Sequence, residues 1–153
     1  MQTMRGETVQ VIVFKLGDER YGVDISQVRE IIRPSLITRI PNAPDFVEGV
    51  INLRGQITTI VNLRKRFGLL PKAIDNDTRI IVVEYNNAVI GMMVDTVNEV
   101  KYLSQKDIEA LPSIITAREE AKFLKGVGKL PDGLLILIDL NKVLNEGEVE
   151  KIK

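Results

Sequence analysis

Short apolar runs rich in β-branched residues alternate with polar turns along most of this chain. Such runs of four to eight residues, bounded by Gly, Asn or Asp, are typical of strands joined in hairpins. The pattern predicts one hairpin from the runs 9–16 and 20–25 and another from the runs 79–85 and 88–94. The chain is therefore expected to be mainly β.

A third hairpin is predicted within the stretch Gly49 to Phe67, GVINLRGQITTIVNLRKRF. Its strands, 50–53 and 56–61, flank a tight corner at Asn52-Leu53-Arg54-Gly55, where glycine supplies backbone freedom. Asn62 then stands where a helix N-cap belongs, and Gly68 marks the end of a short helix. Further short helical turns are predicted after Ser104, which with Asp107 resembles a capping box, and over 140–144 after Asp139.

The two halves of the chain share a residue pattern, which suggests an internal repeat. The block 21–31, YGVDISQVREI, aligns without a gap on the block 90–100, IGMMVDTVNEV, at an offset of 69 from Gly22 to Gly91. A later pair, Gly49 and Gly126, is offset by 77 and begins the looser copy GVGKLPDGLLILIDLNKVL. Each half then consists of hairpin, linker, hairpin and short helix, which predicts two β-barrels of about five strands that could exchange strands. A chance match between β-rich stretches is the alternative.

Composition excludes several classes of function. The 153 residues are 44% hydrophobic and 27% charged, as expected for one globular domain or two small ones that share a core. The chain has no Cys and no His, which removes disulfides, thiolate ligands, the commonest metal ligand and the commonest general base. Its longest apolar run, 134–138, is too short for a membrane span, and the N-terminus has no signal-peptide core. We therefore expect a cytoplasmic protein with no direct membrane insertion, no metal and no cofactor.

Motifs for catalysis are weak throughout. Asp75-Asn76-Asp77 hints at a calcium loop, but the glycine and glutamate that such a loop requires are missing. The glycines of Gly126-Val127-Gly128 precede a predicted strand rather than a helix, so they do not form a dinucleotide fingerprint. A small β-barrel enzyme stays open as an alternative, although nothing in the sequence indicates its site.

Positive charge is concentrated between Gly49 and Ile74, where five cationic residues occur without an acidic one. A nucleic-acid-binding barrel would need interleaved aromatic residues and a basic domain, yet only Phe67 is available and the formal net charge is zero. For the run Arg64 to Arg66, a solvated helix face is expected; a patch for an anionic protein partner is the alternative. Arg54 allows two interpretations, a solvent-exposed turn charge or a recognition arginine whose planar fork pairs with a carboxylate.

These motifs resemble the CheW family, the coupling proteins of bacterial and archaeal chemotaxis. The resemblance covers about residues 9 to 144 and includes RIPNAPDFVEGVINLRGQITTIVNLRKRFG, in which the NLRG corner precedes I-x-x-I-V-N-L. It implies two five-stranded SH3-like barrels joined through a shared apolar core, with few short helices. It also implies a scaffold without catalytic activity.

In that family the coupling protein links the cytoplasmic tips of chemoreceptors, the methyl-accepting chemotaxis proteins, to the histidine kinase CheA. The regulatory domain of the kinase resembles the coupling protein, so contacts between barrels build a signalling array at the membrane. The resemblance places the receptor-binding or adjoining surface at the positions Val28, Glu30, Gly49, Arg54 and Val100. The glycine could instead serve only the start of its strand. The kinase-binding residues are not predicted.

We expect the resemblance to mark one CheW-like domain over 9–144, between flexible termini at 1–8 and 145–153. Part of the segment 111–122 is expected to be a mobile loop. The length leaves no room for a receiver domain, and kinase motifs are absent, which favours a stand-alone coupling protein.

Overall fold

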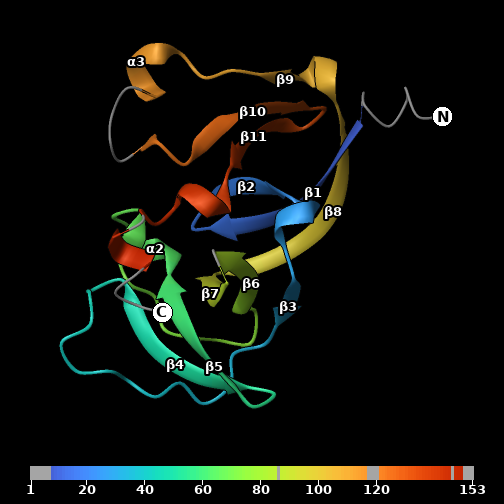
Figure 1. Cartoon of the computed structure of the whole chain (residues 1–153). Helices are drawn as coiled ribbons and strands as arrows, with labels where there is room; N and C mark the ends of the chain where they lie inside the picture. The colour runs from blue at the N-terminus through green and yellow to red at the C-terminus, as the bar shows by residue number, and fades with distance from the viewer. Residues whose placement is uncertain (1–7, 86, 117–120, 146, 150–153) are drawn as a thin grey trace.

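The strands of this chain form two β-sheets (Figure 1). The sheets share an apolar core. The computed structural model describes residues 8–85, 87–116, 121–145 and 147–149. Residues 1–7 and 150–153 of the termini expected to be flexible, and residues 117–120 of the segment 111–122 expected to be partly mobile, lie outside the described residues. Within them the prediction of a mainly β fold with few short helices is confirmed.

The first sheet contains six strands and the second contains five. In spatial order the first sheet consists of β8 (Thr96–Ser104), β1 (Thr8–Leu16), β2 (Glu19–Asp24), β11 (Gly133–Ile138), β10 (Leu124–Leu130) and β9 (Ile108–Glu109). The second consists of β3 (Glu30–Ile32), β6 (Arg79–Tyr85), β7 (Ala88–Val94), β5 (Gln56–Asn62) and β4 (Val47–Leu53). The helical segments are η1 (Ile25–Gln27), α2 (Leu63–Arg66), η2 (Gln105–Asp107), α3 (Ser113–Thr116) and η4 (Leu140–Lys142).

The two halves of the chain exchange their first hairpins. β1 and β2 come from the first half but lie in the sheet that β8 to β11 of the second half complete. β6 and β7 come from the second half and lie in the sheet of β3, β4 and β5. In both sheets the exchanged hairpin pairs in parallel with the last strand of the other half, β2 with β11 and β7 with β5. Neither sheet can therefore form from one half alone.

The strand registers confirm the predicted repeat. Gly22 is paired with Leu137, and its counterpart Gly91 is paired with Ile60. The two partners, Ile60 and Leu137, are 77 residues apart, which is the offset that also relates Gly49 to Gly126. The pairs of Gly49 with Ile60 and Gly126 with Leu137 also correspond, and each follows a register shift in its hairpin. Chance similarity of β-rich segments does not produce matching partners and matching irregularities.

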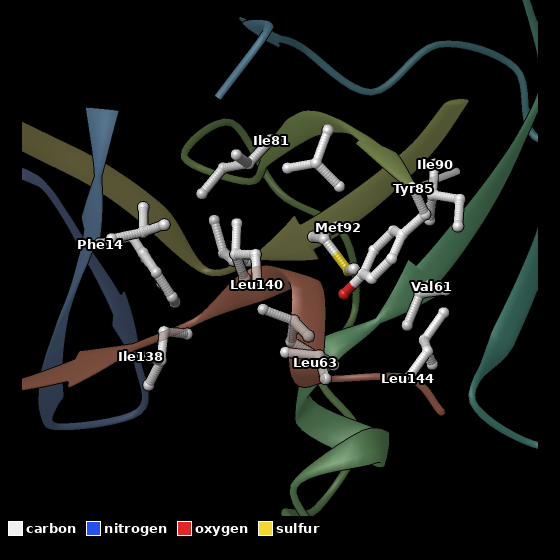
Figure 2. Close-up of a cluster of buried hydrophobic side chains, with 14 of the residues drawn as sticks. Phe14, Val61, Leu63, Ile81, Tyr85, Ile90, Met92, Ile138, Leu140 and Leu144 are labelled. Carbon is white, nitrogen blue, oxygen red and sulfur yellow. The ribbon is translucent and has the colours of Figure 1, made fainter. Parts of the chain in front are cut away.

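Side chains from both sheets meet in one central cluster (Figure 2). Phe14 and Ile138 enter it from the first sheet, and Ile81 and Met92 enter it from the second. Leu63 of α2 and Leu140 of η4 also belong to the cluster. Each sheet also has a smaller apolar cluster of its own. The shared core makes the two sheets one packing unit, because burial of this surface is the main force that stabilises the fold.

Several local predictions are confirmed, and others are wrong. The strands 79–85, 88–94 and 133–138 have the predicted bounds, and the Asn62 side chain caps α2 by accepting from the Lys65 amide at 3.2 Å. Ser104 precedes η2 but makes no capping hydrogen bond, so the predicted capping box does not form. The predicted linkers contain β3 and β8, which the sequence pattern missed because edge strands with one exposed face show no continuous apolar run.

The C-terminal segment also packs against the rest of the fold. Residues 147–149 are helical, and Val149 is buried in the central cluster. The Arg66 guanidinium forms two hydrogen bonds to the Glu148 carboxylate, at 2.9 and 3.0 Å, and a third to the Val143 carbonyl at 2.8 Å. The flexible end predicted from residue 145 stays a prediction; within the described residues, Glu148 and Val149 make specific contacts with the rest of the fold.

Candidate functional site

The corner between β4 and β5 holds an arginine in an unusual backbone conformation. Arg54 has φ of 50° and Gly55 has φ of 87°, so both residues of the two-residue turn are left-handed. For a non-glycine residue this conformation costs roughly 1–2 kcal/mol. The Asn52 side chain supports the turn by accepting a hydrogen bond from the Gly55 amide at 2.8 Å. The sequence pattern assigned the backbone freedom to Gly55 alone and missed that Arg54 shares it.

Arg54 lies beside Glu30, and the two side chains form a hydrogen-bonded ion pair between Nη2 and Oε2. The arginine side chain is 66% exposed, whereas the glutamate side chain is 26% exposed. The guanidinium is thus anchored on one side and open to solvent on the other. The arrangement is compatible with both interpretations of Arg54, since the side chain is both exposed and oriented.

The corresponding corner of the second half differs in chemistry and in backbone. The strand pairings place Leu130 and Gly133 opposite one another, so the two turn residues there are Pro131 and Asp132. Pro131 therefore replaces Arg54, and proline cannot adopt a positive φ. Asp132 forms an ion pair with Arg20 at 3.3 Å. The repeat keeps the hairpin but does not keep an exposed arginine.

The other predicted receptor-facing positions occupy different environments. Val28 lies in the short link between η1 and β3 and packs, partly buried, against the central cluster. Val100 is 46% exposed on β8, where it pairs with Ile12. Gly49 is buried within β4. The structure thus brings Arg54 and Glu30 into contact, places Val28 two residues from Glu30 along the same segment, and leaves Gly49 inaccessible.

The basic residues between Gly49 and Ile74 are all paired with carboxylates that lie outside this stretch of sequence. The pairs are Arg54 with Glu30, Arg64 with Asp95, Lys65 with Glu48, Arg66 with Glu148, and Lys72 with Asp75. The predicted solvated helix face at 64–66 is therefore wrong. A run of cations neutralised in this way is also a poor anchor for a phosphate backbone.

Arg64 and Asp95 form the best-enclosed of these pairs. The guanidinium donates to both carboxylate oxygens, at 2.7 and 2.8 Å, and also to the Leu70 carbonyl at 2.7 Å. The Gly17 amide donates to the same carboxylate at 2.7 Å. Burial alone would raise the pKa of Asp95, but the hydrogen bonds from Arg64 and Gly17, together with the positive charge of Arg64, hold it below its usual value. The hydrogen bond to Asp95 raises the pKa of Arg64. This cluster joins α2, the turn after β1 and the end of β7.

An apolar groove of about 780 Å³ lies on the outer side of the β4–β5 hairpin. The segment 40–44 forms one wall, Val50 and Thr59 line the strands, and Ile57 stands 67% exposed beside them. Ala88 and Val89 of β7 line the groove from the neighbouring strand. The sequence did not reveal this groove, because nothing in the strand sequence QITTIVN shows that Ile57 is exposed whereas Ile60 is buried. We call this feature the apolar groove.

Within the described ranges, no group of three or more acidic side chains is arranged to hold a metal ion. None of the helices in that part of the chain is long and apolar enough to cross a membrane. Asp75 accepts hydrogen bonds from the amides of Asp77 and Thr78, at 2.8 and 3.1 Å, which closes the 75–78 turn. The acidic loop thus has a local structural role.

Comparison with known proteins identifies close similarities over nearly the whole chain. The family model for the CheW-like domain matches residues 10–148. Chemotaxis protein CheW of Klebsiella aerogenes is 40% identical over 149 residues, which cover 95% of this chain and 89% of that protein. Chemotaxis protein CheW of Helicobacter pylori is 34% identical over 140 residues, which cover 92% and 84%.

A solved structure has the same fold. The crystal structure of the scaffolding protein TtCheW from Thermoanaerobacter tengcongensis superimposes with a TM-score of 0.81 at 37% sequence identity. The match covers 92% of this chain and 90% of that protein. The chain is therefore similar to these proteins in length, sequence and fold, as well as in the motifs described above.

Proposed function

This chain belongs to the CheW-like domain family, and from that premise we propose that it is a non-enzymatic scaffold of chemotaxis. It couples the cytoplasmic tips of chemoreceptors to the histidine kinase CheA. The names of its relatives, chemotaxis protein CheW and scaffolding protein TtCheW, support this role. The chain is recruited to membrane receptor arrays on the cytoplasmic side through these partners.

The observation that carries the proposal is the oriented, exposed guanidinium of Arg54. A planar guanidinium held at a rigid corner can pair with a carboxylate of a partner in two parallel hydrogen bonds. Glu30 lies beside it, and Val28 and Val100 supply apolar contact area. We assign these residues to the receptor-facing surface. In such surfaces a few buried apolar anchors give most of the affinity, while charges set the register.

The kinase-binding surface includes the apolar groove. A scaffold must present apolar area to a folded partner, and the exposed side chains of Ile57 and Ile40 provide it beside a concave wall. The partner is the regulatory domain of the kinase, whose barrels resemble those of this chain. Arg54 and Ile57 belong to one hairpin, so a single rigid element carries parts of both surfaces. A change in the contacts made at one surface can then alter the contacts made at the other, without a catalysed reaction in this chain.

The experiment that tests this function is reconstitution from purified parts. The chain, mixed with the regulatory domain of CheA at roughly tens of micromolar, should shift the elution of that domain from a sizing column. A pull-down with a receptor-tip fragment should retain the chain, and a mixture of all three should give one complex. Absence of both binary complexes at that concentration would refute the proposed function.

A further inference from the structure

Gly49 has no room for a side chain, although it belongs to the positions predicted to face the receptor. It is buried in β4 with φ of 148°. A Cβ atom at this position would lie 2.1 Å from the Thr38 carbonyl oxygen and 2.8 Å from the carbonyl carbon. Backbone atoms cannot give way as a flexible side chain can, so any substitution must push Thr38 away.

Thr38 is held against β4 by two backbone hydrogen bonds. Its amide donates to the Val50 carbonyl at 2.9 Å, and the Val50 amide donates to the Thr38 carbonyl at 2.9 Å. The wall of the apolar groove begins two residues further on, at Ile40. The bridge between Thr38 and Val50 therefore anchors the segment 37–44, and the bare backbone of Gly49 is what allows this close approach.

We propose that Gly49 is a positioning residue for kinase docking rather than a contact for the receptor. It allows the segment 37–44, here called the groove wall, to lie on β4 and so gives the apolar groove its shape. This inference rests on the proposed function, since it assigns Gly49 to the kinase-binding surface of the same scaffold.

The second half of the chain contains the same arrangement. A Cβ atom on Gly126 would lie 2.7 Å from the Glu109 carbonyl oxygen, and Glu109 pairs with Val127 as Thr38 pairs with Val50. Both halves thus use a glycine to admit a crossing segment. The arrangement recurs in a hairpin that lacks an exposed arginine. It therefore serves to let one backbone segment approach another closely, and does not depend on the arginine.

The first test measures the groove wall without any partner. In Gly49→Ala, hydrogen exchange of the Thr38 and Val50 amides should accelerate by about tenfold or more, while amides of the first sheet keep their protection. Two controls separate the causes. Gly126→Ala places the same methyl group against the other carbonyl, and Gly68→Ala adds one at φ of 78° with no atom within 4 Å. Neither control should change exchange at Thr38 or Val50. Unchanged protection in Gly49→Ala would overturn the positioning role.

The second test compares the two partners. Gly49→Ala should weaken binding of the kinase regulatory domain about tenfold and leave binding of a receptor-tip fragment within about twofold. Loss of receptor binding with intact kinase binding would make Gly49 a receptor contact and overturn the inference. A native chain that binds neither probe would overturn the proposed function, and the docking role with it, whereas the exchange measurement would still decide whether Gly49 positions the wall.

If Gly49→Ala does not fold, Thr38→Pro provides a separate route to the same answer. Proline removes the amide that donates to Val50 but leaves Gly49 unchanged. The variant should show faster exchange at Val50 and the same selective loss of kinase-domain binding. Full kinase-domain affinity in Thr38→Pro would overturn the inference.

Discussion

Arg54 at the tip of the β4–β5 hairpin forms an ion pair with Glu30 of β3. In the strand order of the five-stranded sheet, β3 and β4 are the first and last strands. Because the arginine side chain is 66% exposed, such a pair contributes only about 0–1 kcal/mol to stability. Its consequence is orientation, since a guanidinium anchored on one side presents its remaining donors in a fixed direction.

Arg54→Glu should weaken binding of a receptor-tip fragment by about tenfold or more, because it replaces the exposed donor by an acid and repels Glu30. The free energy of unfolding should fall by no more than about 1 kcal/mol, and binding of the kinase regulatory domain should persist. Pull-down and urea denaturation measure these quantities. Unchanged retention on receptor tips would show that Arg54 is only a solvated turn residue.

A charge swap separates the internal pair from the external contact. The double variant Arg54→Glu with Glu30→Arg can form the ion pair again and should regain the stability of the native chain. Receptor binding should not return, because the guanidinium then lies on β3 instead of the corner. Recovery of receptor binding in the swap would mean that the pair itself, rather than the position of the arginine, is required.

Asp95→Ala should lower the free energy of unfolding by about 2 kcal/mol. The substitution leaves the half-enclosed Arg64 guanidinium without its carboxylate and the Gly17 amide without its acceptor. Asp132→Ala is the matched control, since it also removes the carboxylate partner of an arginine, but this carboxylate is 67% exposed and its loss should cost less than about 0.5 kcal/mol. Urea denaturation of both variants measures the difference. Equal costs would show that the Arg64 cluster does not join the sheets energetically.

The low pKa of the Asp95 carboxylate predicts that the stability of the fold depends on pH. The pKa of Asp95 is lower in the folded chain than in the unfolded chain, so the unfolded chain binds the proton more readily. The stability it contributes is complete above the unfolded value of about 3.9 and is lost as the pH falls through the lower folded value. Asp95→Asn should therefore reduce the dependence of unfolding free energy on pH below about pH 4. If the unfolding free energy of Asp95→Asn depended on pH below about 4 as steeply as that of the native chain, Asp95 would not be the source of this dependence.

Val149→Ala should destabilise the chain by about 1–2 kcal/mol, because Val149 is buried in the central cluster. Val100→Ala makes the same chemical change at a half-exposed position and should have a smaller effect on the unfolding free energy. Thermal denaturation of the two variants compares them directly. Equal effects would indicate that the C-terminal segment is as loosely attached as its composition suggests.

Local features of the fold could be predicted because they depend on neighbours in the sequence. The hairpin of 79–85 and 88–94 shows its strands as apolar runs and its turn as two asparagines. The strands β3 and β8 could not be predicted in this way, since each is stabilised by partners from the other half. The same holds for the cations, because Arg66 finds its carboxylate 82 residues away.

The sequence by itself determined the strands of the main hairpins, the positions of their turns, the repeat that relates Gly22 to Gly91, and the arginine at the β4–β5 corner. These are properties of short segments, where periodicity and turn chemistry act. Only the tertiary structure decided which hairpin enters which sheet, which acid neutralises Arg64, and that Gly49 lies beneath Thr38 instead of on the surface. Each of these outcomes depends on packing between segments far apart in the chain, and no local pattern contains that information.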